Sequence, residues 1–194
     1  MAQFGGPKLV KKLHFKKTAN TTLIEGINKI ANAVGSTLGA SGRTVVIEDD
    51  FGNPHVTKDG VTVANSIMLH NPVENLAVAM MKQAAQQTAN VAGDGTTTSI
   101  VLAQAIIDCY KKQGGDAFSF RDIKSGITQY SKHIIDILEK MSVKVDDKRL
   151  EDVSIISANN DKELGKLIAS AFKKAGNNGI VAMETSPDSN TYID

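Results

Sequence analysis

The chain has 194 residues and 41% hydrophobic content, enough for one good-sized domain or for one domain and part of a second. Its formal net charge of +1 gives no reason to expect nucleic acid or a membrane surface as a partner. It has no signal-peptide core and no run near the roughly 20 apolar residues of a membrane span, so we expect a globular protein of the cytoplasm.

Residues that bind soft metals or stack on bases are scarce. Cys109 is the single cysteine, which excludes an intrachain disulfide and fits a reducing compartment. The four histidines are scattered and have no neighbour at the spacing of zinc ligands. Tryptophan is absent and aromatic residues make up 5%, so the sequence offers no stacking platform for nucleic acid bases.

The N-terminal part predicts a strand and then a helix. Residues 13–15 alternate in polarity like a short strand, which would need a partner. Thr22 and Glu25 have the spacing of a capping box, and apolar residues then recur at helical intervals up to Leu38. The sequence therefore predicts a helix that begins near Thr22 and ends near Leu38.

A β-hairpin is predicted next. Residues 44–48 are mostly β-branched and are bounded by turn residues, which is typical of a strand. Residues 55–57 can return as its partner after the intervening turn. Residues 58–60 are predicted to form a tight turn that exposes two opposite charges.

Three long helices follow. Asn71 and Pro72 are typical of an N-cap and a first helical residue, and they predict a helix that ends at Val91. Residues 96–113 are apolar nearly all round, so this second helix is expected to be covered on several sides. Residues 119–141 predict a third helix with one apolar side.

The composition becomes charged and polar beyond residues 143–145, which indicates a domain boundary. Asn160 is predicted to cap a helix that Gly176 ends, and residues 180–183 are predicted to form a strand. Residues 191–194 begin another strand that nothing completes. We therefore expect the chain to be a fragment of a longer protein.

The stretch from Ala92 to Thr98 has the composition of a ligand-binding loop. Gly93 and Gly95 allow the backbone to approach a bulky group closely, and three threonines begin the next helix. Amides and hydroxyls at a helix N-terminus can hold phosphate, and Asp94 is placed to hold Mg²⁺ against its oxygens. No lysine follows the glycines, so this is not a Walker A loop. Taken alone, the stretch fits equally well a helix-loop-helix turn with an Asp-Gly bend.

Two further stretches accompany this loop: Thr-Leu-Gly-Ala-Ser-Gly-Arg at residues 37–43 and Thr-Lys-Asp-Gly-Val at residues 57–61. Together with residues 93–98 they resemble the N-terminal portion of a group I chaperonin, the GroEL-type ring ATPase of bacteria and organelles. Arg43 and Lys58 favour the group I pattern over the group II pattern. With three matches in chain order, the plain turn becomes the weaker interpretation.

The resemblance implies a mainly α fold in two parts. Residues 1–140 would be the N-terminal half of a multihelical equatorial, nucleotide-binding domain with a small β-hairpin, and residues 141–194 an incomplete α/β segment of the intermediate domain. ATP and Mg²⁺ would be the cofactors, with Asp94 as the metal ligand and Asp59 as the catalytic carboxylate that helps to position the attacking water. Nucleotide contacts are implied for Thr37, Leu38, Gly39, Ala40, Lys58, Asp94, Gly95, Thr96, Thr97 and Thr98.

The sequence also departs from the family pattern. Ala40 and Ser41 stand where the family usually has Pro and Lys, which loosens that loop but leaves its backbone groups available. Lys144 replaces a Pro that is common at the lower hinge. In the family, the apical domain, the second catalytic aspartate and the rest of the equatorial domain would lie beyond Asp194.

Two functions of different classes are open at this point. The first is the ATP-binding part of a ring-forming chaperonin that assists protein folding by ATP-driven conformational cycling, with little or no turnover by this chain because one carboxylate is missing. Its implied partners are unfolded client proteins, bound through regions absent here, other subunits of a homo-oligomeric ring, and a co-chaperonin. The alternative is a non-catalytic fragment that keeps oligomer contacts. An unrelated phosphotransferase is disfavoured, because no acceptor site is evident.

Overall fold

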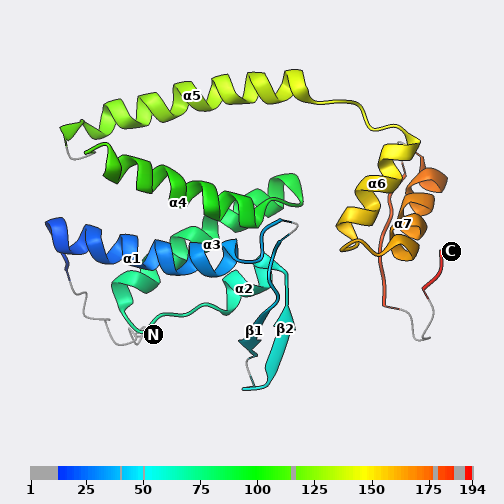
Figure 1. Ribbon diagram of the computed structural model, residues 1–194, viewed down its shortest axis with the longest axis horizontal. Coiled ribbons are helices and arrows are strands. Elements are labelled where there is room, and N and C mark those ends of the chain that lie inside the picture. Colours follow the sequence, from blue (N-terminus) through cyan, green and yellow to red (C-terminus); the bar gives the residue numbers. More distant parts are fainter. Residues whose placement is uncertain are drawn as a thin grey trace, which may run out of the picture. The chain divides into compact units, whose positions relative to one another are not determined.

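The computed structural model describes residues 13–39, 41–49, 51–114, 117–176, 179–185 and 191–193. Within these residues the chain has seven α-helices and one two-stranded antiparallel hairpin, so the predicted mainly helical fold with a small hairpin is confirmed (Figure 1). The chain divides into two compact units, residues 1–120 and residues 121–194, and each is described by itself.

Helices dominate the first unit. Three long helices, α1, α3 and α4, pack against one another, and the short α2 joins them (Figure 1). The hairpin lies next to α2, with Val45 opposite Thr57 and Glu48 opposite Pro54. The elements are α1 (Lys16–Gly35), β1 (Val45–Glu48), β2 (Pro54–Thr57), α2 (Gly60–Ser66), α3 (Pro72–Ala92) and α4 (Thr96–Lys112).

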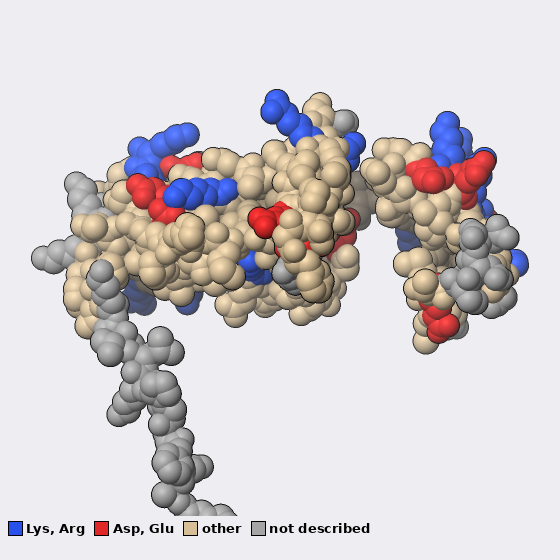
Figure 2. All heavy atoms as spheres, turned by 90° about the horizontal axis from the view of Figure 1, so that it is seen from below, with Lys and Arg blue, Asp and Glu red and all other residues tan. Residues whose placement is uncertain are grey.

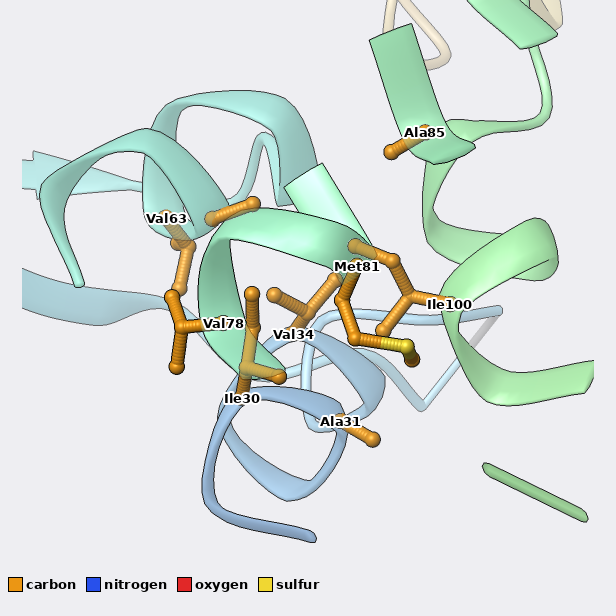
Figure 3. Packing of buried hydrophobic residues seen from close by; sticks show 9 residues of the cluster. Ile30, Ala31, Val34, Val63, Val78, Met81, Ala85 and Ile100 are labelled. Atoms are coloured by element: carbon orange, nitrogen blue, oxygen red, sulfur yellow. The ribbon is translucent and has the colours of Figure 1, made fainter. Parts of the chain in front are cut away.

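One hydrophobic core lies among these four helices. Figure 3 shows its side chains pointing toward one another from α1, α2, α3 and α4. Full burial of each large aliphatic side chain stabilises the fold by about 1.5–3 kcal/mol. The core therefore fixes α2 and α4 against α1 and α3. Its buried members are Ile30, Ala31, Val34, Val63, Ala64, Val78, Met81, Ala85 and Ile100.

The start of α3 lies close against α1. A Cβ on Gly26 would lie 2.8 Å from the Cα of Glu74, so the two backbones meet where α1 has no side chain. Glu74 is buried, and its Oε2 accepts a hydrogen bond from Nζ of Lys29 at 2.6 Å. This pairing supplies the partner that a buried carboxylate requires.

The structure corrects two predictions at the N-terminal end. The helix begins at Lys16, and the hydroxyl of Thr22 donates to the carbonyl of Thr18 one turn earlier, so the predicted capping box at Thr22 and Glu25 is wrong. Residues 13–15 form no strand. Phe15 has extended backbone as the residue before the helix.

The hairpin and the two long helices α3 and α4 are confirmed, whereas α2 was not predicted. The side chain of Asn71 accepts hydrogen bonds from the amides of Val73 at 2.9 Å and Glu74 at 3.5 Å, and Pro72 opens α3 as predicted. Helix α4 packs against α1, α2 and α3, but these contacts cover only part of its apolar surface. Within α4 the buried residues are Thr96 and Ile100, whereas Leu102 is 57% exposed.

The second unit contains α5 (Phe120–Met141), α6 (Asp147–Ser157) and α7 (Lys162–Ala175). Helix α5 was predicted, although none of its residues is buried. Helices α6 and α7 pack so closely that a Cβ on Gly165 would lie 2.5 Å from the Cα of Ile155. The absence of a side chain at Gly165 allows this approach. The sequence did not predict α6.

Two further predictions in this unit are wrong. Asp161, not Asn160, caps α7, and its carboxylate accepts from the amides of Glu163 and Leu164 at 3.0 Å each. Residues 180–183 are irregular, as are residues 191–193, so the expected strands are absent from the described residues. All the regular secondary structure described in this unit is therefore helical.

Charged side chains of both signs are interspersed on the face shown in Figure 2. None of the described helices has the length and apolar character needed to cross a membrane.

Candidate functional site

Three separate stretches meet at Gly60. A Cβ on Gly60 would overlap Oγ1 of Thr97 and would lie 3.1 Å from Cβ of Thr97 and 3.3 Å from Oγ1 of Thr37. Gly60 begins α2, Thr97 lies in the first turn of α4, and Thr37 follows α1. The structure therefore brings together one residue from each of the three stretches that carry the family resemblance.

The loop after α1 is closed by its own hydrogen bonds. The Thr37 hydroxyl donates to the Val34 carbonyl at 2.7 Å, and the Arg43 amide donates to the Ser36 carbonyl at 2.8 Å. The Gly42 amide donates to the Gly39 carbonyl at 2.9 Å. These bonds hold Thr37 at the end of α1, beside Gly60.

The loop between α3 and α4 turns on two glycines with left-handed backbone, Gly93 at φ 76° and Gly95 at φ 87°. The Gly95 amide donates to Oδ1 of Asp94 at 2.6 Å, and the Asp94 side chain is exposed. Among the described residues no side chain caps α4. The amides of its first turn, Thr96 to Thr98, therefore offer donors and partial positive charge at this end.

Asp59 is the N-cap of α2, so the predicted tight turn at residues 58–60 is the start of a helix. Its Oδ1 accepts from the Val61 amide at 3.3 Å, and its Oδ2 accepts from the Thr62 amide at 3.0 Å and from the Thr62 hydroxyl. Partial burial acts to raise the pKa of Asp59, but these hydrogen bonds outweigh it and hold the pKa below its ordinary value.

We expect this capping to make stability depend on pH. A carboxyl with a lower pKa in the folded chain stabilises it above the unfolded pKa of about 3.9, and the effect is lost as pH falls through the folded pKa. Asparagine is itself a good N-cap residue, so Asp59→Asn chiefly removes the negative charge at the helix N-terminus. It should lower the free energy of unfolding by roughly 0.3–1 kcal/mol at pH 6 and by less at pH 3. Urea unfolding at both pH values measures this. A difference that does not change with pH would contradict it.

The structure places the predicted site residues unequally. Thr37 and Thr97 meet at Gly60, and Thr96 is buried at the start of α4. The side chains of Lys58, Asp94 and Thr98 are exposed. Leu38 and Gly39 follow Thr37 in the closed loop, Gly95 precedes α4, and Ala40 lies outside the described residues.

The sequence did not assign a role to Gly60. The sequence feature that could have indicated a role is its position directly after Asp59, in one of the three stretches. There it was interpreted as a turn residue. Only the fold shows that its missing side chain makes room for Thr97.

The Asp94 carboxylate suits a magnesium ion that is shared with phosphate, because Mg²⁺ takes oxygen ligands. No group of three or more His, Cys, Asp or Glu side chains that could hold a metal by itself occurs among the described residues. Mg²⁺ typically takes one or two carboxylates and leaves its other positions to water and phosphate oxygens. Asp94 has a second oxygen, Oδ2, that accepts no hydrogen bond from the described residues.

Comparison with known proteins places this chain in a family. Residues 30–189 match the model of the TCP-1/cpn60 chaperonin family. The chain is 43% identical over 187 residues to chaperonin 60 subunit beta 1, chloroplastic, of Arabidopsis thaliana. The aligned region is 94% of this chain and 31% of that relative. It is also 43% identical over 189 residues to the RuBisCO large subunit-binding protein subunit beta, chloroplastic, of Pisum sativum, with 95% and 32% coverage.

Solved structures agree with this placement. The chaperonin gp146 of bacteriophage EL 2 (Pseudomonas aeruginosa), crystallised in the presence of ATP-BeFx, matches with a TM-score of 0.71 and 30% identity, over 81% of this chain and 28% of that one. A group III chaperonin in the open state matches with a TM-score of 0.66 and 26% identity. This match covers 79% of this chain and 31% of that one. The chain spans about a third of the length of the curated relatives that it matches. It belongs to the TCP-1/cpn60 chaperonin family and has GroEL-type relatives, as the three sequence stretches indicated.

Proposed function

We propose that the chain is the ATP-binding part of a ring-forming chaperonin, which assists protein folding through ATP-driven conformational cycling. The observation that supports this proposal is the meeting of Thr37, Gly60 and Thr97 beside the uncapped first turn of α4. A chaperonin with the same fold was crystallised in the presence of ATP-BeFx. Residues 1–140 would be the equatorial part and residues 141–194 the intermediate part.

The chain's own residues would act mainly by positioning. The amides and hydroxyls of Thr96 to Thr98, with Gly95, would hold phosphate oxygens at the start of α4. Thr37 to Ala40 would lie along the nucleotide, and Lys58 would add positive charge near the phosphates. Phosphoryl transfer depends chiefly on such positioning and on charge stabilisation.

Two carboxylates, Asp94 and Asp59, would bind the metal ion and orient the attacking water. Asp94 would hold Mg²⁺, which when bound neutralises charge on the phosphates. Asp59 would help to orient the attacking water: its Oδ1 accepts one hydrogen bond within the chain, so one acceptor position is left. With one such carboxylate in this chain, we expect slow hydrolysis or none.

Assembly and location follow from the same proposal. The partners would be unfolded client proteins, other subunits of a homo-oligomeric ring and a co-chaperonin. The two plant relatives are chloroplastic by name. For this chain a cytoplasmic location stays our proposal.

Calorimetric titration of the chain with MgATP tests the proposal. We expect saturable binding near one nucleotide per chain, weakened when a chelator removes the metal. Phosphate release measured on the same sample should be slow or absent. No binding of MgATP, together with self-association in sedimentation, would instead favour a non-catalytic fragment that keeps oligomer contacts. The exposed Val46 and Val56 on the hairpin would suit such contacts.

A further inference from the structure

The short helix α2 depends on its surroundings for its position. It has seven residues, and helices of this length are not stable alone in water. Asp59 caps its N-terminal end, and Val63 and Ala64 pack into the core. Two of its last carbonyls are paired locally, that of Val63 with the Ser66 hydroxyl at 2.9 Å and that of Ala64 with the Ile67 amide at 3.3 Å. The carbonyls that follow need a partner from elsewhere.

Lys82 on α3 supplies that partner. Its Nζ donates to the carbonyl of Ile67 at 2.8 Å and to the carbonyl of Asn65 at 2.9 Å. Ile67 is the C-cap residue of α2, directly after its last residue, Ser66. A positive charge at the C-terminal end of a helix is favourable, because the last carbonyls carry partial negative charge.

The setting of Lys82 is unusual for a lysine on a helix surface. Partial burial lowers its pKa. Among the described residues no carboxylate lies within ion-pair distance of its ammonium group, so the two carbonyls are the partners that the structure shows. A nearby bond from the Leu69 amide to Oδ1 of Asn75, at 3.0 Å, also ties the α2–α3 connection to α3.

We propose that Lys82 is a positioning residue for the nucleotide site. By tying the end of α2 to α3, it holds the other end of α2 in place, where Asp59 caps the helix and Gly60 lies against Thr97. Helix α3 itself leads into the loop that carries Asp94, so this tie links two parts of the site. The expected effect of Lys82 on nucleotide binding rests on the proposed function. Its expected effect on the position of α2 rests on the geometry alone.

The test compares Lys82→Met with Lys82→Arg in the full chain. Methionine keeps the length and apolar stem of the side chain but removes both hydrogen bonds, and arginine keeps charge and donors. We expect Lys82→Met to bind MgATP about tenfold more weakly, since it loses two charge-assisted hydrogen bonds, and Lys82→Arg to restore most of the affinity. The control is Lys112→Met, at the exposed end of α4, which should bind like the wild type.

Hydrogen exchange separates this role from a general loss of stability. In Lys82→Met the amides of residues 63–67 should exchange faster, while those of α1 around Ile30 and Val34 keep their protection. Unchanged MgATP affinity would overturn the proposal, and so would a loss of protection across the whole core. If the wild-type chain itself bound no MgATP, the proposed function would fail, and the exchange data would still decide whether Lys82 holds α2.

Discussion

Asp94→Ala is expected to weaken the binding of MgATP by at least about a hundredfold. Clustered phosphate charge needs a hard cation, and Asp94, in the loop before α4, is the carboxylate that we propose holds it. The variant loses the bond from the Gly95 amide to Asp94, but this bond is exposed to solvent, and the left-handed residues that turn the loop, Gly93 and Gly95, are unchanged. The free energy of unfolding should therefore change little.

Calorimetry with MgATP and with metal-free ATP measures the effect. In Asp94→Ala the two affinities should converge, because the carboxylate that couples metal to nucleotide is gone. Asp152→Ala, an exposed aspartate in the other unit, is the matched control and should behave as the wild type does. Wild-type affinity for MgATP in Asp94→Ala would exclude Asp94 as the metal ligand.

The second large effect is expected from Gly60→Ala. In most helices alanine is the better residue, by roughly 0.5–1 kcal/mol over glycine. At position 60 the added methyl group would overlap Oγ1 of Thr97 and crowd Oγ1 of Thr37, so α2 or the start of α4 must move. Overpacking of this kind costs about 1–3 kcal/mol, so the clash should outweigh the gain in helix propensity. Binding of MgATP should weaken as well.

Gly126→Ala provides the contrast. Gly126 lies in α5, and a Cβ there would meet nothing within 4 Å, so this change should leave stability unchanged or raise it. Adding Thr97→Ala to Gly60→Ala should recover stability if the clash is the cause. Urea unfolding of the two single variants and the double variant gives the coupling between the positions. Additive effects would show that Gly60 and Thr97 do not interact.

Helices with strong local signals could be predicted from the sequence. Asn71 and Pro72 mark the start of α3 by hydrogen-bonding chemistry that acts within a few residues, and the structure shows those bonds. The hairpin was predictable for the same reason, because β-branched strand residues are bounded by turn residues. Predictions of this kind depend on neighbours in the chain and need no knowledge of the tertiary fold.

Elements that depend on distant contacts were missed. Helix α2 contains the β-branched run Val61 to Val63, which suits a helix poorly on its own. The core and the bonds from Lys82 stabilise it, and neither can be deduced from local pattern. Conversely, residues 180–183 have the composition of a strand, but a strand needs a partner, and the described residues provide none.

For the candidate site too, some features could be predicted from local sequence and others depend on the tertiary fold. The residue types of the phosphate loop could be interpreted chemically, and the three stretches together indicated the family. That Gly60 lies against Thr97 and close to Thr37 depends on how α1, α2 and α4 pack. The sequence therefore indicated which stretches matter, whereas the contact that unites them required the fold.

The bond between the Gly95 amide and Asp94 also bears on the chemical ageing of the protein. That nitrogen lies 2.6 Å from Oδ1 of Asp94, and glycine has no side chain to shield it. Its attack on the side-chain carboxyl carbon, with loss of water, closes a succinimide ring that reopens largely as isoaspartate. Asp59 also precedes a glycine, but its carboxylate is held by the amides of Val61 and Thr62. We therefore expect stored protein to lose its proposed metal ligand before its proposed catalytic carboxylate, with isoaspartate detected by peptide mapping at position 94 before position 59.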